Sequence, residues 1–266
     1  MTIPDQLLSI YLHIPFCSTK CTYCAFNTYI DLDALIPAYV DALTKEIEFV
    51  GQGNIYPHVH TIYFGGGTPS LLSAGQFSQL LDAIHTHFNV QVDAEISTEA
   101  NPNDLNVTYL RGLRHVGINR LSIGMQTANT EELGLFDRRH DTVDVVHSVD
   151  AARQAGFDNV SLDLIYGFPQ QSMSSWSNSL RLIKDLQVEH LSLYALGLET
   201  GTQLDNWVAL GKLDMPDDDL IADMYEYATE HLGHHGYEQY EISNWAKPDR
   251  ACEHNLQYWR NLPYLG

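Results

Sequence analysis

The stretch "SIYLHIPFCSTKCTYC", residues 9 to 24, joins a β-rich run to a cluster of cysteines. Residues 9 to 16 contain β-branched and aromatic side chains typical of a strand, and Cys17, Cys21 and Cys24 follow in a C-x3-C-x2-C spacing. Thiolates spaced this closely on one loop favour a soft metal ion or an iron-sulfur cluster. The stretch therefore predicts a strand that ends at a metal-binding loop.

Five further β-rich runs follow along the chain, separated by helical segments. The runs cover residues 60–67, 94–100, 119–126, 159–167 and 190–198. Between runs, segments such as residues 33–50 carry apolar side chains at the i, i+3, i+4 spacing of a helix that packs on one face. Six alternations predict an α/β protein with a parallel sheet, either an open doubly wound sheet or a partial barrel of the TIM type. Both place the chemistry at the carboxyl ends of the strands.

The end of the chain differs in character from the first 205 residues. Residues 214–237 form an acidic amphipathic pattern that predicts a helix closed near Gly236, and residues 237–246 alternate aromatic side chains as in a strand. We therefore expect a barrel over residues 1–205 and an α+β extension over residues 206–266. Because the sequence stops at "NLPYLG" without a closing helix, we expect this extension to be incomplete.

Composition narrows the possible partners. Fourteen Lys and Arg residues against 34 Asp and Glu residues give a net charge of −20, which repels nucleic acid and anionic lipid. No stretch approaches the roughly 18 apolar residues of a membrane span, and the first residues lack the charged region of a secretory signal. We expect a cytoplasmic protein that is not integral to a membrane and does not bind nucleic acid.

Three clustered cysteines leave the identity of a fourth metal ligand open. A structural zinc ion needs four protein ligands, but His13 lies inside the strand run and Cys252 is distant in sequence. An iron-sulfur cube held by three cysteines leaves one iron open to a ligand from outside the protein. Zinc and metal-free thiols remain alternatives, and clustered thiols in a chain without an export signal favour the iron-sulfur cluster.

A glycine-rich turn in "YFGGGTPS", residues 63 to 70, is a second candidate site. Three glycines at a strand end allow positive φ angles and a close approach of the backbone to a ligand. The turn lacks the Gly-Lys-Ser/Thr ending of a phosphate-binding loop, and Ser70 stands where the last glycine of a dinucleotide-binding turn belongs. A simple tight turn is the alternative interpretation.

The order of these features resembles the radical S-adenosylmethionine (SAM) superfamily, over essentially the whole predicted barrel. The resemblance rests on the cysteine spacing, on the GGGTP turn and on polar residues in the later strands. It implies a partial (β/α)6 barrel in which the three cysteines hold a [4Fe-4S] cluster, and in which the amino and carboxylate groups of SAM ligate the fourth iron. The residues that it implies for SAM binding, or for contact with the cluster, are Tyr11, Gly65, Gly66, Thr68, Glu99, Gln126, Arg138 and Asp163.

Three further segments resemble one group of that superfamily, the oxygen-independent coproporphyrinogen III oxidases. They are "YLHIPFC", "DLIYGFPQQ" and "GYEQYEISNWA". The oxidases carry another cysteine two positions after the third, where this chain has Phe26. This departure argues against oxidative decarboxylation of a porphyrinogen.

The segment "CEHNLQYW", which begins at Cys252, resembles the H-N-x-x-Y-W motif of the HemW family of heme chaperones in the same group. The resemblance implies that His254, Asn255, Tyr258 and Trp259 bind heme. A neutral imidazole is a suitable axial ligand for heme iron, and a helix would place Tyr258 on the same face as His254. We interpret Cys252 as a small buried residue rather than as a second heme contact.

These inferences predict a heme chaperone with three ligands, namely a [4Fe-4S] cluster, SAM and heme. Its clients would be hemoproteins, including membrane-bound respiratory proteins reached by peripheral contact with the inner face of the membrane. The sequence leaves open whether the protein is also an enzyme. If it is, the reaction would be SAM cleavage or coproporphyrinogen III oxidation. The oxidase is the alternative function, and a zinc-stabilised binding protein is a third.

Overall fold

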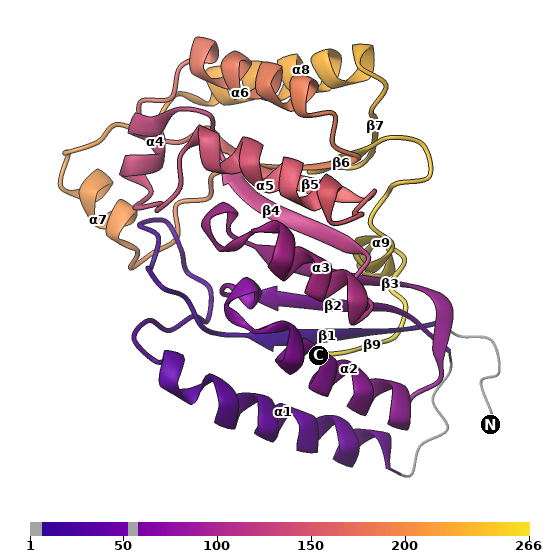
Figure 1. Ribbon diagram of the computed structural model, residues 1–266. Coiled ribbons are helices and arrows are strands. Elements are labelled where there is room, and N and C mark those ends of the chain that lie inside the picture. The colour runs from indigo at the N-terminus through magenta and orange to yellow at the C-terminus, as the bar shows by residue number, and fades with distance from the viewer. Residues whose placement is uncertain (1–6, 53–57) are drawn as a thin grey trace.

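One sheet organises the part of the chain that the structure describes. The computed structural model describes residues 7–52 and 58–266. Within these residues, nine strands follow the order β7-β8-β6-β5-β4-β3-β2-β1-β9 (Figure 1). The first strands in the chain are β1 (Leu8–Ile14), β2 (Val59–Gly66), β3 (Val90–Ala100), β4 (Arg120–Gln126), β5 (Val160–Tyr166) and β6 (His190–Ala195). Consecutive members of this series pair in parallel.

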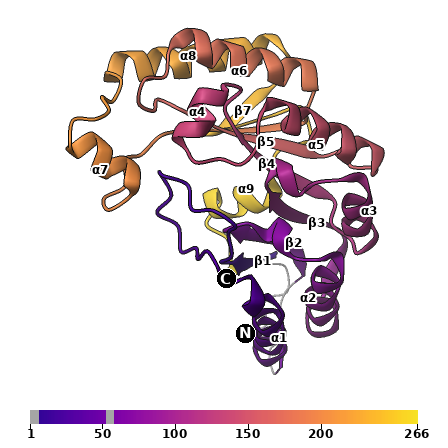
Figure 2. The ribbon, with the colours of Figure 1, turned by 60° about the vertical axis from the view of Figure 1, so that its left-hand side comes forward.

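Helices connect these strands and cover one face of the sheet. They are α1 (Ile36–Gly51), α2 (Ala74–His87), α3 (Val107–His115), α4 (Thr130–Leu135), α5 (Thr142–Gln154) and α6 (Met173–Leu186). Figure 2 shows α1, α2, α3, α5 and α6 along the outer side of the curved sheet. Because β1 to β6 lie in chain order, without the reversal that defines a doubly wound sheet, the predicted partial barrel is confirmed.

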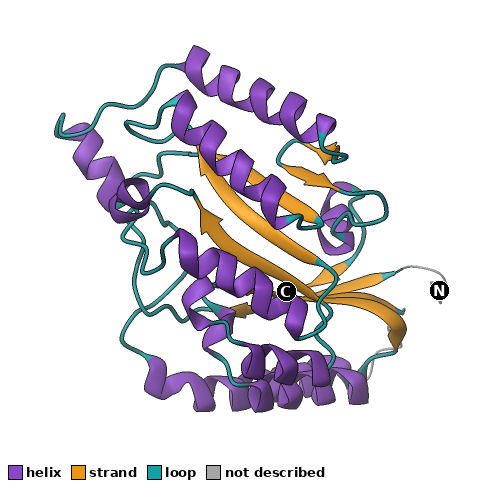
Figure 3. Cartoon of the chain, turned by 45° about the horizontal axis from the view of Figure 1, so that its top comes forward, coloured by secondary structure: helices purple, strands orange, loops and turns teal. Residues whose placement is uncertain are grey.

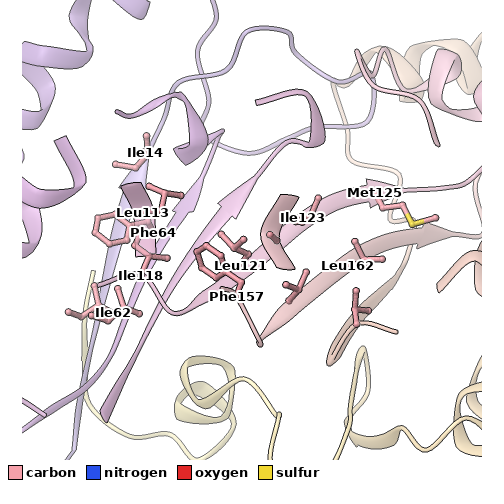
Figure 4. Packing of buried hydrophobic residues seen from close by; sticks show 14 of the residues in the cluster. Ile14, Ile62, Phe64, Leu113, Ile118, Leu121, Ile123, Met125, Phe157 and Leu162 are labelled. Atoms are coloured by element: carbon pink, nitrogen blue, oxygen red, sulfur yellow. The ribbon is translucent and has the colours of Figure 1, made fainter. Parts of the chain in front are cut away.

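Alternate residues of each strand separate an apolar outer layer from a polar interior. Leu121 and Ile123 of β4 are fully buried in the core that also contains Leu113 of α3 (Figure 4). Arg120 and Ser122, in the other phase of the same strand, line the cavity of the barrel. Each buried Leu or Ile stabilises the fold by about 1.5–3 kcal/mol, so the outer layer holds the barrel together while the inner face carries polar groups.

Local signals in the sequence mark several element ends correctly. The Ser-x-x-Gln spacing of Ser73 and Gln76 is a capping-box signal in the sequence, and the two residues form that box at the start of α2. Gly156 has a φ angle of +90°, as expected just after the end of α5. Strand lengths are less accurate, because β3 already begins at Val90 and β6 ends at Ala195. None of the helices in the described ranges is long and apolar enough to cross a membrane.

The last segment extends the same sheet at both edges. Its elements are α7 (Gln203–Ala209), α8 (Asp218–His234), β7 (Glu238–Glu241), β8 (Asn244–Ala246), α9 (Glu253–Trp259) and β9 (Tyr264–Leu265). The single strand predicted over residues 237–246 is wrong, since the chain turns there and forms β7 and β8 as an antiparallel pair. β8 pairs with β6, and β9 pairs with β1. The first six residues of the predicted 1–205 unit lie outside the described residues.

Candidate functional site

The candidate site is a cavity of about 810 Å³ inside the barrel, with a size typical of small-molecule sites. Its wall includes side chains from each of the strands β1 to β6 and from α9. The loops that follow β1 to β6 gather at one end of the sheet (Figure 3), and the loop after β1 brings the cysteines to the cavity. Parallel strands thus collect residues that lie far apart in the sequence around one space.

The three clustered cysteines share this cavity. Cys17, Cys21 and Cys24 all line it and are partly exposed. The Thr68 hydroxyl donates a hydrogen bond to Cys17 Sγ at 3.4 Å, and Arg138 Nη1 donates to Cys21 Sγ at 3.6 Å. Burial raises the pKa of the Cys17 thiol, and the hydrogen bond from Thr68 lowers it. Both donors point at sulfur atoms that would bind a metal.

The arrangement of ligands fits a cluster better than a single metal ion. Among residues 7–52 and 58–266, no three His, Cys, Asp or Glu side chains converge closely enough to hold one ion. His13 Nε2 contacts the Asn27 carbonyl at 2.9 Å, and Cys252 Sγ donates to Glu95 at 3.4 Å. Because a cube distributes its protein ligands over separate irons, three cysteines around one cavity suit a [4Fe-4S] cluster, with neither His13 nor Cys252 as the fourth ligand.

Backbone contacts hold the cysteine loop in place. The Cys17 amide donates to the Tyr29 carbonyl at 2.9 Å, which closes the loop onto its own base. The Thr22 hydroxyl donates to the Leu135 carbonyl at 2.8 Å, at the end of α4. The Tyr23 ring packs edge-on against Phe136, with ring centroids 4.8 Å apart. Contacts within the loop and to the end of α4 therefore position the thiols.

The glycine-rich turn brings the end of β2 against the same loop. Gly66 has a φ angle of +116°, which favours glycine. A Cβ atom on Gly67 would lie 2.6 Å from the Phe16 carbonyl oxygen and 2.9 Å from that of Ile14. The absence of a side chain at Gly67 therefore lets the end of β2 approach the backbone that precedes Cys17. The Gly65 position, where a Cβ would meet Glu99 Oε1 at 3.1 Å, instead faces the polar interior.

Polar residues of β3, β4 and β5 line the interior beside this turn. Glu99 accepts hydrogen bonds from the Tyr63 hydroxyl at 3.0 Å and from the Gly66 amide at 3.1 Å. Gln126 ends β4 with a φ angle of +63°, a strained conformation of the kind found at ligand sites. Asp163 lies in the middle of β5 rather than at the carboxyl end of the strand, and its side chain faces the cavity.

The ionisation of Glu99 should depend on pH within a range that is easily measured. Burial and then the Asp163 carboxylate raise the pKa of Glu99 from 4.5 to about 7. The folded protein therefore keeps a proton that the unfolded chain loses above pH 4.5, so this residue's contribution to stability falls as the pH rises from 4.5 to 7. Between about pH 5 and 8, the unfolding free energy of the unchanged chain should fall by about 1–3 kcal/mol relative to Glu99→Gln.

Urea unfolding at both pH values measures this difference. Asp93→Asn, which removes an exposed carboxylate of the same strand, is the control and should follow the unchanged chain. Identical pH profiles for Glu99→Gln and the unchanged chain would show that Glu99 is already ionised at low pH.

Arg138 connects the strand ends to the cysteines. Its Nη2 donates to Asn101 Oδ1 at 2.7 Å and to the Gly124 carbonyl at 2.8 Å, while Nη1 reaches Cys21. The guanidinium is thus held by the residue that follows β3 and by β4, and it points its charge toward the thiols. Of the residues predicted for SAM, the structure brings all except Gly65 into the cavity wall; the full set in the wall is Tyr11, Gly66, Thr68, Glu99, Gln126, Arg138 and Asp163.

The residues predicted for heme have different environments. Asn255 and Tyr258 line the cavity, whereas Trp259 is 56% exposed and is not in the cavity wall. His254 is only 2% exposed, and its ring stacks on Tyr63 with centroids 5.0 Å apart. The predicted i, i+4 relation holds, since Tyr258 and His254 contact each other through their polar atoms.

Both ring nitrogens of His254 have partners in this structure. Nδ1 lies 2.8 Å from the Thr61 hydroxyl, and Nε2 lies 3.0 Å from the Tyr258 hydroxyl. Burial and then the nearby His60 and Arg120 charges lower the pKa of His254 to about 3, so the imidazole is neutral at pH 7. Binding of iron at Nε2 therefore requires that Tyr258 move away.

Sequence reasoning missed the polar residues farther from the strand ends. Arg120 and Glu95 lie on β4 and β3 and belong to the interior face. A signal was available, because Arg120 has the same period-two phase as Ser122 and Gln126. Neither residue lies at the carboxyl end of its strand, so the expectation that functional residues lie at those ends did not select them.

Comparison with known proteins supports the predicted family. The family model of the Radical SAM superfamily matches residues 11–183. The heme chaperone HemW of Mycobacterium tuberculosis (strain CDC 1551 / Oshkosh) is 41% identical over 267 aligned residues, which cover 99% of this chain and 68% of that protein. HemW of Escherichia coli (strain K12) is 36% identical over 264 residues, with coverage of 97% and 68%.

A solved structure agrees with these relatives. Coproporphyrinogen III oxidase (HemN) from Escherichia coli, described as a radical SAM enzyme, superposes with a TM-score of 0.83 at 31% identity, over 93% of this chain and 57% of that one. The chain spans about two thirds of the length of the two HemW proteins. The chain belongs to the radical SAM superfamily and, within it, to the HemW family.

Proposed function

We propose that this protein is a heme chaperone that holds a [4Fe-4S] cluster and SAM in the barrel cavity, binds heme beside α9 and delivers it to client hemoproteins. The observation that carries the proposal is the identity of 36–41% to curated heme chaperones over nearly the whole chain. The cavity supports it, because the three cysteines and two residues of the H-N-x-x-Y-W motif line the same space.

Cys17, Cys21 and Cys24 would hold the cluster, which when bound would be a low-potential electron donor beside SAM. Arg138 and Thr68 donate hydrogen bonds to two of these sulfurs, which stabilises their negative charge. Glu99 and Asp163, both turned into the cavity, offer carboxylates to the amino and ribose hydroxyl groups of SAM. Tyr11 and Gly66 close the wall beside them.

His254 is the candidate ligand for heme iron. Its imidazole is neutral, which iron requires, and Nδ1 is oriented by the Thr61 hydroxyl in the way that a metal-binding histidine usually is. The Tyr258 hydroxyl occupies Nε2 and lines the cavity, so it shields the ligand until heme arrives. Asn255 and Trp259 would contact the porphyrin edge and face.

Replacement of His254 by alanine should weaken hemin binding at least about tenfold, since loss of even an outer partner of a metal ligand typically costs about 10–100-fold in affinity. The measurement is a titration of the chain with hemin, followed by its Soret absorption. His234→Ala, at an exposed position near the end of α8, is the matched control and should bind as the unchanged chain does. A Soret band of unchanged position and strength in His254→Ala would remove His254 as the ligand.

Oxygen-independent coproporphyrinogen III oxidation is the second candidate function, favoured by the superposition on HemN. Phe26, at the position of the oxidases' additional cysteine, is 69% exposed on the cysteine loop and supplies no thiol. Incubation of the reconstituted chain with coproporphyrinogen III and SAM distinguishes the two functions. We expect no protoporphyrinogen, and its formation would replace the chaperone proposal.

The partners and location follow as part of the same proposal. A chaperone of this kind would act in the cytoplasm and meet membrane-bound respiratory hemoproteins by peripheral contact with the inner face of the membrane. The net charge of −20 disfavours direct adsorption to anionic lipid, so the contact would be with the client protein rather than with the bilayer.

A further inference from the structure

A buried arginine in the cavity has no bound partner. Arg120, the first residue of β4, is 2% exposed and lines the cavity. Its Nε is buried without a hydrogen-bond partner. In the described ranges, the ion pairs formed by arginines involve Arg139, Arg153, Arg250 and Arg260, and none involves Arg120. Since guanidinium is always charged in proteins, this charge lies in the interior without an acceptor.

The carboxylates near Arg120 already accept hydrogen bonds from other donors. Glu95 accepts from the backbone amides of Glu253 and His254 at the start of α9, both at 3.2 Å. Glu99 accepts from Tyr63 and Gly66, and Asp163 accepts from the Ser122 hydroxyl at 2.9 Å. These groups reduce the electrostatic cost of burying Arg120, but their bonds to other donors leave the planar fork of the guanidinium open.

Arg120 lies at the end of the cavity remote from the cysteines. It precedes Gly124, whose carbonyl accepts from Arg138 beside Cys21, by four residues along β4. At 3.3 Å per residue this separates the two positions by about 13 Å. Burial and then the Arg120 charge keep the pKa of His190 well below its ordinary value, so this neighbour is neutral and the positive charge at this end rests on Arg120.

We propose that Arg120 is a carboxylate-binding residue for the small-molecule ligand of the barrel cavity. A guanidinium fork pairs with a carboxylate through two parallel hydrogen bonds, which fixes the orientation of the ligand as well as adding affinity. The inference rests on the proposed function, because the two ligands named there both carry this group. Heme has propionates, and the candidate heme ligand His254 lies close enough to Arg120 to feel its charge. SAM also has a methionyl carboxylate, but a SAM molecule bound to the cluster iron would hold that group at the opposite end of the cavity, so the position of Arg120 favours the propionates of heme.

Two pairs of probes test the proposal and identify which ligand supplies the carboxylate. The members of each pair differ only in that group. The pairs are hemin and its dimethyl ester, and SAM and decarboxylated SAM, titrated against the anaerobically reconstituted chain. For the hemin pair, the dimethyl ester should bind about 10- to 100-fold more weakly than hemin, the usual value of charge-assisted hydrogen bonds. In Arg120→Gln this ratio should fall to about one, with the affinity for the carboxylate-free probe retained.

Variants separate ligand binding from a structural role. Arg120→Lys keeps the charge but loses the two parallel hydrogen bonds of the guanidinium, so it should retain part of the difference in affinity between the two probes. Arg250→Gln removes one positive charge from an ion pair on the surface and should leave both ratios unchanged. If Arg120 only balances interior charge, Arg120→Gln will weaken both members of a pair equally and keep their ratio, which overturns the proposal.

The failure of this inference is distinguishable from the failure of the proposed function. A chain that binds hemin and SAM normally, with both ratios intact in Arg120→Gln, would reject the carboxylate site alone. A chain that binds neither hemin nor SAM would reject both proposals together.

Discussion

Replacement of Cys21 by serine should leave a colourless protein after anaerobic reconstitution, whereas the unchanged chain should bind about four irons and four sulfides. Cys21 lines the cavity together with Cys17 and Cys24 and receives the hydrogen bond from Arg138. With only two of these sulfurs left, the loop cannot hold a cube whose fourth iron already lacks a protein ligand. Analysis of iron and acid-labile sulfide measures the loss, which should be nearly complete.

Cys252→Ser is the matched control for this experiment. Burial raises the pKa of the Cys252 thiol to about 12, and the thiol donates to Glu95. It therefore stays protonated at neutral pH and should not bind iron, so this variant should reconstitute as the unchanged chain does. Loss of the cluster in Cys252→Ser would make Cys252 the fourth ligand. Stoichiometric zinc without sulfide in the unchanged chain would instead support the zinc-stabilised binding protein.

Replacement of Gly67 by alanine should strongly destabilise the chain, because the new methyl group would collide with the cysteine loop. The new Cβ would lie 2.6 Å from the Phe16 carbonyl oxygen and 3.0 Å from Cys17 Sγ. Backbone atoms cannot rotate away as a side chain does, so β2 and the cysteine loop must separate. We expect a loss of about 3 kcal/mol or more in unfolding free energy, at the upper end of the cost of overpacking, together with poor cluster incorporation.

A second glycine provides the control for this substitution. Gly233 lies in the last turn of α8, and outside the backbone of that helix no atom lies within 4 Å of the place that an alanine methyl group would take. Gly233→Ala should therefore leave the stability unchanged or raise it by less than about 1 kcal/mol, the difference in helix propensity between alanine and glycine in a helix interior. Urea unfolding of both variants gives the comparison. Equal stability of Gly67→Ala and the unchanged chain would mean that the β2 end and the loop do not approach as closely as the structure describes.

The sequence resemblance and the comparisons agree on the family because the motifs that carry the resemblance are short and local. Each of these patterns, namely the cysteine spacing, the glycine turn and the period-two runs, is encoded within about ten residues. Such patterns can be recognised without knowing the fold. The same locality explains the correct capping box at Ser73 and the correct glycine end at Gly156. It also explains the error over residues 237–246, because a turn between two short strands resembles one continuous strand when only the alternation is read.

By itself, the sequence determined the alternation of strand and helix, because this depends on periodicity along the chain. Its cysteine and glycine motifs indicated the family, and the choice of a barrel over a doubly wound sheet came only through that resemblance. Only the tertiary structure decided that β9 returns beside β1, that His254 lies behind Tyr258, and that Arg120 faces the cavity without a partner. Burial and pairing of a side chain are set by neighbours that fold in from distant strands. A polar residue in a strand is therefore identifiable from the sequence, but whether another residue or a ligand satisfies it depends on the assembled barrel.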